Sequence, residues 1–305
     1  MHRILAGAAC IGLVSPSVVA AQSFERVLAP SSNWYLDGGE TRCRLLRKFG
    51  EGPDAHLFFL ETDQPSAHAS FLIAGPTLEK IDWSKSIEIQ LGDLEKIDLQ
   101  SAHGGDFEGF GSALMNSSIW LGEPKTEIAP QDDKEASEEV SVEAERGLPR
   151  IVSERFSEVS RLSVTQGEES VISLELGGFT QALEALNLCS ENFVSYWGLD
   201  LEKHRSMQHG PKLTNLDEIA RRVVWSYRGR ALRRGEQGTV RFLVMVDESG
   251  QVTSCRQSNA TEFESLESPI CKEIARAQFE PARDAKGQPM RSYYASSVRY
   301  TLPSR

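Results

Sequence analysis

Beyond its first residues, this 305-residue sequence has no long uninterrupted run of apolar side chains. A membrane-spanning helix needs roughly 20 such residues, so only the N-terminus is a candidate for one. Hydrophobic residues make up 40% of the chain, which is typical of a globular protein with one sizeable core or two modest cores.

Motifs that mark common enzymes are also missing, including GxSxG, HExxH, the Walker loop and the dinucleotide-binding glycine pattern. GFGSAL at residues 109–114 lacks the second glycine of a nucleophile elbow, and we interpret it as a loop. His103 with Asp106, and His204 with His209, are the candidate metal ligands. His204 and His209 are five positions apart, which is poor helical spacing for a shared ion, and we expect these linker histidines to be solvated. We therefore expect no catalytic residue, cofactor or metal site; an enzyme with an unrecognised site in the N-terminal half is an alternative.

The N-terminus has the pattern of a secretory signal peptide, residues 1–21. Two basic side chains precede an apolar stretch, Pro16 interrupts it, and small residues suit cleavage near Ala21. An uncleaved membrane anchor is disfavoured because the stretch is rich in small residues and contains proline. A lipoprotein attached through Cys10 is disfavoured because Gly-Ala-Ala precedes it. We expect export to the periplasm.

Cysteine is scarce, and the five cysteines are far apart. Cys10 leaves with the signal, so four remain in an oxidising compartment, where an even number predicts two disulfides. Of the three pairings we favour Cys43 with Cys189 and Cys255 with Cys271, because each bridge then stays within one domain. Unpaired buried thiols are an alternative, and zinc is disfavoured because no CxxC or histidine pair accompanies them.

Charge is unevenly distributed along the chain. Residues 205–305 carry 17 Lys and Arg against 11 Asp and Glu, whereas the whole chain has a net charge of −11. The two halves are thus electrostatically complementary, either because they dock on each other or because one acidic loop dominates. Segment 123–146, with nine acidic and three basic residues, is that loop, a disordered insertion or a long surface loop. Export argues against nucleic acid as the partner of the basic half.

Residues 22–200 predict a β-rich domain. Short apolar runs bounded by turn residues indicate a sandwich or meander: TRCRLLRKFG, AHLFFLET, ASFLIAG, KSIEIQLG and ESVISLELGG. FTQALEALNLCSENFVSYWG predicts a closing helix that starts at Phe179. An early tryptophan and cysteine followed by ISLELGGFTQALEAL make this half faintly similar to invasion-associated locus B proteins, which are exported β-rich domains.

A polar linker is expected at residues 201–212, followed by a small domain at residues 213–305. Asn215 and Glu218 predict a capping box for NLDEIARRVVWSYRGRAL, and two alternating strands flank the turn at residues 247–250. PICKEIARAQ predicts a second helix, which Pro281 ends. A turn and a last strand follow. The order predicts an α+β protein whose C-terminal domain is a three-stranded antiparallel sheet with two helices over one face.

Periodicity also predicts which side chains of this domain face its core. On the first helix these are Leu216, Ile219, Val223 and Tyr227. On the last strand we expect Tyr294, Val298, Tyr300 and Leu302 to face inward, and Tyr293, Arg299 and Thr301 to face outward.

YRGRALRRGEQGTVRFLVMVDESGQVTSC and the later IARAQFEPARDAKGQP resemble the C-terminal domain of the TonB family, over about residues 213–305. The matching positions are Tyr227, Ala231, Gly238, Val240, Phe242, Val244, Gly250, Phe279, Pro281, Ala282, Gly287 and Pro289. Two positions depart from the pattern. Arg228 replaces a proline, and Ala277-Gln278 precede Phe279 where the family has an arginine, with Arg276 as a shifted equivalent.

The resemblance implies a binding mode, because TonB domains add a partner's short peptide to the edge of their sheet. We expect the last strand to be such an edge, with open N–H and C=O groups. The predicted peptide-binding residues are Ser292, Tyr293, Tyr294, Ala295, Ser296, Ser297, Val298, Arg299 and Tyr300. An edge that pairs with a second copy, or that Arg291 and Arg299 protect, is the alternative.

We therefore expect an exported periplasmic protein, not an enzyme, that binds a protein partner such as a TonB-dependent outer-membrane transporter in envelope transport or organisation. The family's best-known members also have a permanent N-terminal membrane helix and a long proline-rich spacer that transmit force from a proton-driven complex, and this sequence shows neither. A membrane-anchored energy transducer that keeps residues 4–21 is the alternative.

Overall fold

The structure is a computed structural model of the chain. It describes residues 27–99, 102–124, 146–234, 238–259 and 268–300. The predicted signal peptide, nearly all of the acidic segment, Thr301 and Leu302 lie outside the described residues. Among the described residues, no helix is both long and apolar enough to cross a membrane.

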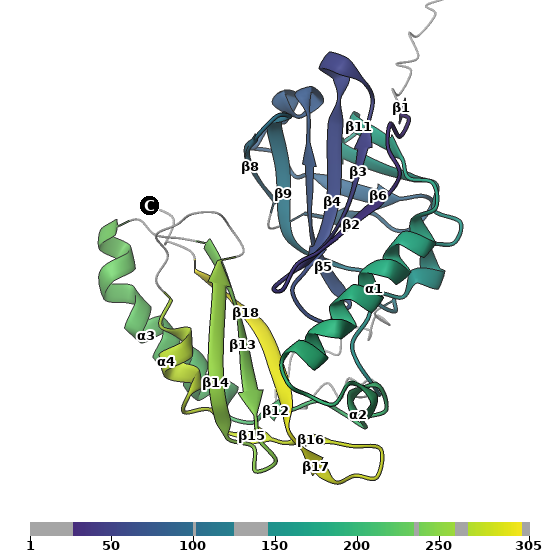
Figure 1. Ribbon diagram of the computed structural model, residues 1–305. Helices are drawn as coiled ribbons and strands as arrows, with labels where there is room; N and C mark the ends of the chain where they lie inside the picture. Colours follow the sequence, from purple (N-terminus) through teal and green to yellow (C-terminus); the bar gives the residue numbers. More distant parts are fainter. Residues whose placement is uncertain (1–26, 100–101, 125–145, 235–237, 260–267, 301–305) are drawn as a thin grey trace, which may run out of the picture.

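The N-terminal part is a sandwich of two sheets (Figure 1). The six-stranded sheet has the order β2 (Tyr35–Gly38), β3 (Cys43–Phe49), β4 (His56–Thr62), β5 (His68–Ala74), β9 (Gly111–Trp120) and β8 (Ala102–Phe107). The five-stranded sheet has the order β1 (Val27–Leu28), β11 (Glu169–Glu175), β10 (Arg161–Gln166), β6 (Glu88–Leu91) and β7 (Ile97–Asp98). Three short 3-10 helices connect strands: η1 (Gly52–Asp54), η2 (Pro76–Lys80) and η3 (Ser153–Phe156).

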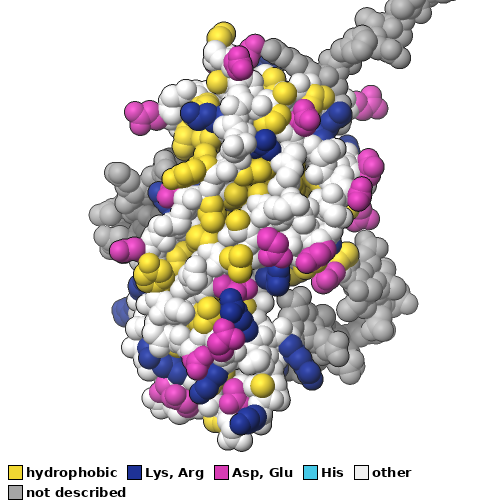
Figure 2. Space-filling model, turned by 45° about the vertical axis from the view of Figure 1, so that its right-hand side comes forward, with side chains coloured by type: hydrophobic (Ala, Val, Ile, Leu, Met, Phe, Trp, Pro, Cys, Tyr) yellow, Lys and Arg dark blue, Asp and Glu magenta, His cyan; other side chains and the backbone are white. Residues whose placement is uncertain are grey.

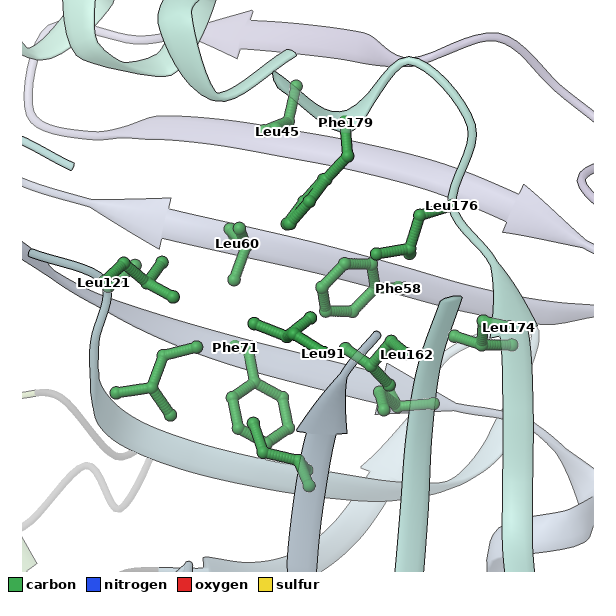
Figure 3. Close-up of a cluster of buried hydrophobic side chains, with 14 of the residues drawn as sticks. Leu45, Phe58, Leu60, Phe71, Leu91, Leu121, Leu162, Leu174, Leu176 and Phe179 are labelled. Carbon is green, nitrogen blue, oxygen red and sulfur yellow. The ribbon is translucent and has the colours of Figure 1, made fainter. Parts of the chain in front are cut away.

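The sandwich core lies between the two sheets, where alternate side chains of each sheet meet (Figure 3). Leu60 and Phe71 come from the six-stranded sheet, and Leu162 comes from the five-stranded sheet. Helix α1 (Phe179–Tyr196) covers this core with Phe179 and with further apolar side chains at helical spacing. The predicted strands and the closing helix are confirmed. GFGSAL is only partly a loop, because β9 begins at its second glycine, paired with β8.

Both favoured disulfides are present. Cys43 on β3 is bonded to Cys189 on α1, which fixes the closing helix to the sandwich. Cys255 is bonded to Cys271, which joins a strand of the C-terminal part to a helix above it. Each bridge thus ties two layers of the same part of the molecule.

The C-terminal part is an antiparallel sheet with the order β14 (Val252–Asn259), β13 (Gly238–Val246) and β18 (Ser292–Tyr300). Helices α3 (Leu216–Arg234) and α4 (Ile270–Ile274) lie on the side of this sheet that faces away from the sandwich (Figure 1). Between helices and sheet lies a second core, formed by Ile219, Val223, Val240, Phe242, Val244, Ile270, Ile274, Phe279 and Tyr300 with smaller contributors.

Two details of the predicted helices were wrong. Helix α4 ends at Ile274 and not at Gln278, because both backbone groups of Gln278 are bonded to Thr214 and Asn215 and not within the helix. A turn after Ile274 leads into strand β15 (Phe279–Glu280), which pairs with β12 (Lys212–Leu213). At the start of α3, the Asn215 amide contacts Glu218, but its carbonyl oxygen accepts from the backbone N–H of Gln278. Asn215 therefore joins α3 to the chain after α4 and does not make a reciprocal capping box.

The corner after Pro281 is a small hairpin of β16 (Ala282–Arg283) and β17 (Pro289–Met290). The carboxylate of Asp284 accepts hydrogen bonds of 2.9 Å from the backbone N–H groups of Lys286 and Gln288. Gly287 completes the turn with a φ of 76°, which glycine adopts without strain. The hairpin reverses the chain and delivers it into β18.

The segment predicted as a polar linker is folded and partly buried. It contains helix α2 (Leu201–Arg205), and His204, predicted to be solvated, is only 1% exposed. Asp200 caps α2 by accepting from the backbone N–H of Lys203. The linker is buried because it joins a third apolar cluster between the two parts, which also includes Val194, Met207 and Tyr293.

The predicted facing of side chains was right for most positions. Ile219 and Val223 are buried, Tyr227 packs on the second core, and so do Tyr294, Val298 and Tyr300. Leu216 is 59% exposed, because it is the first residue of α3 and precedes the turn that reaches the core. Tyr293 does point away from the helices, but it is buried, since the end of α1 covers that face of the sheet.

Candidate functional site

Strand β18 lies at one end of the C-terminal sheet. It pairs with β13 along its full length, from Ser292 opposite Val246 to Tyr300 opposite Gly238. No strand of the described residues pairs with its other side. Because backbone N–H and C=O groups of successive residues in a strand point to opposite sides, half of these groups are directed away from β13.

A cleft of about 630 Å³ follows this open side of β18. Its lining includes Tyr293 and Ala295, which face away from α3 and α4, and also Tyr294 and Ser296, which face toward them. From β13, in contrast, only Thr239 and Arg241 contribute. A cleft that touches both faces of β18 runs along the edge of the strand and extends over one face. Its volume is in the range of protein ligand sites, which is roughly 300–1,000 Å³.

The N-terminal sandwich forms the opposite wall of the cleft. This wall consists of residues 61–70, at the end of β4 and the start of β5, and of Ser117, Ser118 and Trp120 on β9. Residues 207 and 209–212, which lead from α2 to β12, also line the cleft. The edge strand and the sandwich therefore face each other across one hollow.

A β-bulge shapes the sandwich wall. Ala69 pairs with Ile119 and Phe71 pairs with Asn116, so Ser117 and Ser118 together oppose the single residue Ser70. A bulge removes a residue from the regular ladder and redirects its backbone groups. The carbonyl of Ser117 consequently points out of the sandwich and accepts a hydrogen bond of 2.8 Å from Nη2 of Arg241 on β13.

Most charges around the cleft are engaged. Arg241 Nη1 lies 4.0 Å from the Asp63 carboxylate, and Arg44 donates to Glu61 at 2.6 Å. Burial raises the pKa of Asp63, and the nearby Arg241 guanidinium opposes this rise. Glu61, Asp63 and Arg241 also line a smaller cavity of about 260 Å³ on the β14 side of the sheet. The contact between Arg241 and Asp63 thus separates two hollows between the parts.

The inner end of the cleft rests on a packed cluster. The Tyr293 ring lies 4.7 Å from the Trp197 ring, edge to face, and 6.2 Å from the His204 ring. His204 bonds the Asp200 carbonyl through Nδ1 at 2.6 Å and the Ser292 hydroxyl through Nε2 at 3.0 Å. Burial lowers the pKa of His204 and raises that of Tyr293. The Tyr293 hydroxyl is buried and has no hydrogen-bond partner among the described residues.

The cleft brings together five of the nine predicted peptide-binding residues: Tyr293, Tyr294, Ala295, Ser296 and Ser297. Ser292 does not line it, because its hydroxyl is bonded to His204. Tyr300 does not line it either, since its hydroxyl bonds Ser268 at 2.7 Å. Val298 and Arg299 lie beyond its outer end.

Residues of the sandwich wall were missed by sequence reasoning. Ser117 and Arg241 are 124 positions apart, and no local pattern links them. The only signal was general, namely the complementary charge of the two halves. Among the described residues there is no group of three or more His, Cys, Asp or Glu side chains that could hold a metal ion. Charged side chains of both signs are interspersed over the lower part of the face in Figure 2, without a single-sign patch.

Comparison with known proteins agrees with this geometry in the C-terminal part. No curated protein and no solved structure matches the chain. Residues 225–302 match the family model described as the Gram-negative bacterial TonB protein C-terminal. The match starts within α3 and covers the sheet, α4 and β18. Residues 225–302 are therefore similar to a TonB C-terminal domain.

Proposed function

We propose that this chain is an exported periplasmic protein that binds an extended segment of a partner protein by adding it as a fourth strand beside β18. A protein that acts in envelope transport or envelope organisation, such as a TonB-dependent outer-membrane transporter, is the partner class that this domain favours. The peptide-binding residues are those of β18, Ser292–Tyr300, with Tyr293–Ser297 at the centre. The chain acts by binding and not as an enzyme.

The observation that carries this proposal is the open side of β18 within a cleft. A strand-addition site needs unpaired backbone groups together with room for a second chain, and the cleft supplies the room along residues 293–297. These five residues span about 17 Å at the usual rise per residue in a strand. A segment of about five residues therefore fills the site.

We also propose that the chain is divided into two domains and a connecting segment. Residues 22–200 form the sandwich domain, residues 201–212 connect it, and residues 213–305 form the binding domain. Each of the two domains has its own hydrophobic core, which supports this division. Two disulfides support export, because such bonds persist in oxidising compartments. N-terminal sequencing of the exported protein tests this, and we expect the mature chain to start at Ala21 or Gln22.

The binding function is tested with a named probe, a phage-displayed library of random dodecapeptides selected on the disulfide-bonded protein. Selected peptides are then synthesised, labelled and titrated by fluorescence anisotropy. We expect a shared motif and saturable binding. If repeated selections yield no peptide with saturable binding, the proposal is contradicted.

Two adjacent proline substitutions locate the site. Of Ser296 and Ser297, one N–H points to β13 and the other to the open side, because the direction alternates along a strand. Ser296→Pro and Ser297→Pro should therefore differ. One variant loses a ladder hydrogen bond and unfolds at lower temperature, whereas the other keeps its melting temperature and loses peptide binding.

The variant that keeps its stability decides the question. If it binds the selected peptides as tightly as the unsubstituted protein, β18 is not the binding edge. Light scattering of the unliganded protein tests the alternative of edge-to-edge pairing. A dimer that the stable proline variant converts to monomer assigns the open side of β18 to self-association instead.

A further inference from the structure

We propose that the sandwich domain is a specificity-determining wall of the same peptide groove, so that it selects which segments β18 accepts. This inference rests on the proposed function of β18. A segment that adds to β18 has one row of side chains on the α3 and α4 side and the other row on the sandwich side. The second row must fit against residues 61–70 and the Ser117–Ser118 bulge.

The wall is held at a fixed position relative to β18. Arg241 on β13 reaches the Ser117 carbonyl of the sandwich. The end of α1 packs on the face of the sheet that points away from α3 and α4, with Trp197 against Tyr293. Met207 and Leu199 belong to the same buried cluster. A wall fixed at several points sets the width of the groove, because the two domains cannot separate without breaking these contacts.

Small side chains make up part of this wall, beside the larger His68 and Trp120. Ser66, Ala67, Ser70, Ser117 and Ser118 line the cleft there. Their size leaves space for large side chains of a bound segment, and their hydroxyl groups can donate or accept hydrogen bonds. Acidic groups at this wall are already paired, Asp63 with Arg241 and Glu61 with Arg44.

The chemistry of the ligand follows from this lining. A charged side chain directed at the wall loses water and finds no free counter-charge at the serine cluster, which is unfavourable. We therefore infer a segment whose wall-facing residues, at every second position, are large and uncharged. Charge at the intervening positions, and outside a stretch of about five residues, is tolerated because those positions lie away from the wall.

Ser118 is the residue to change. It is exposed, it lies in the bulge, and it lines the cleft. In Ser118→Trp we expect at least a tenfold weaker affinity for peptides selected on the unsubstituted protein, because the indole occupies the groove. Ser160→Trp is the matched control, an exposed serine of the same domain outside the cleft lining, and should leave the affinity unchanged.

A charge placed on the wall tests specificity directly. Repeating the library selection on Ser118→Asp should enrich Lys and Arg at one wall-facing position of the peptides, which an inert wall does not produce. Ser66→Asp provides a second, independent variant in the connection between β4 and β5. Circular dichroism and melting temperature show that each variant is folded.

The outcomes separate the two proposals. If no peptide is selected at all, strand addition itself fails. If peptides bind and the stable proline variant of β18 abolishes binding, but Ser118→Trp binds normally and the Asp variants select the same sequences, the function of β18 stands and the specificity role of the sandwich is overturned.

Discussion

The guanidinium of Arg241, on the middle strand of the C-terminal sheet, donates a 2.8 Å hydrogen bond to the backbone carbonyl of Ser117, in the bulge of the sandwich. The Arg241 side chain lines the cleft and is 19% exposed. Its second nitrogen faces Asp63. This residue therefore couples the position of the two domains to the charge balance of the cleft.

Replacing Arg241 with methionine should destabilise the protein. A hydrogen bond from a charged donor contributes about 1.5–3 kcal/mol, and the substitution also leaves the Asp63 carboxylate without its cation. We expect a loss of about 2–3 kcal/mol in the free energy of unfolding, measured with urea. Arg256→Met is the control, because Arg256 is exposed on the outer strand β14, and it should change stability by less than about 0.5 kcal/mol.

Arg241→Met should also change how the free energy of unfolding depends on pH. The folded-state pKa of Asp63 is raised above its ordinary value of 3.8, so its charged form opposes folding and stability falls as the pH rises through the folded pKa. Without Arg241 that pKa rises further. The loss caused by Arg241→Met should thus be larger at pH 8 than at pH 4, and an equal loss at both values contradicts the pairing.

Tyr293→Phe should stabilise the protein or leave its stability unchanged. The Tyr293 hydroxyl is buried without a partner among the described residues, and an unsatisfied buried polar group costs about 1–3 kcal/mol. Tyr300→Phe is the matched comparison, since the Tyr300 hydroxyl bonds Ser268, and it should cost about 1 kcal/mol. Thermal unfolding distinguishes them. A clear loss of stability in Tyr293→Phe indicates a hydrogen bond that the described residues do not provide.

Acid should weaken the contact between the domains through His204. Burial lowers the folded-state pKa of His204 below the ordinary value of 6.5. The stability that neutral His204 contributes to the fold is therefore fully present above pH 6.5 and is lost as the pH falls through the folded pKa. Protonation adds a charge in a cluster beside Tyr293, and Nε2 can then no longer accept from Ser292. His204→Gln should flatten the dependence of melting temperature between pH 7 and pH 5, whereas His103→Gln on β8 should keep it.

Gly250 should tolerate no side chain. It ends the turn between β13 and β14 with a φ of 83°, and an added Cβ would lie 2.0 Å from the Phe279 carbonyl oxygen. Gly109 has a nearly identical φ of 81° but no atom within 4 Å of an added Cβ. Gly109→Ala should cost about 1–2 kcal/mol for the backbone conformation alone. Gly250→Ala should cost clearly more in urea unfolding, and equal costs contradict the close packing of turn and corner.

Local patterns in the sequence predicted much of the fold. The alternating runs specified the strands of the sandwich, and helical spacing from Phe179 specified α1, because side-chain periodicity is a property of the chain's own geometry. The disulfide pairing followed from keeping each bridge within one domain, and the structure confirms it. The match of residues 225–302 to the TonB C-terminal family confirms the recognition that rested on spaced glycine, proline and aromatic positions.

Tertiary structure alone decided the surroundings of β18. The sequence determined that Tyr293 and Tyr294 point to opposite faces, since alternation is local, but it did not determine that α1 and α2 bury the face that carries Tyr293. Nor did it determine that Ser117 meets Arg241 from 124 positions away, because contacts between domains depend on the packing of whole surfaces. The sequence was sufficient to predict strand β18 and the resemblance to the TonB C-terminal family. Only the tertiary structure placed the sandwich along the open side of that strand.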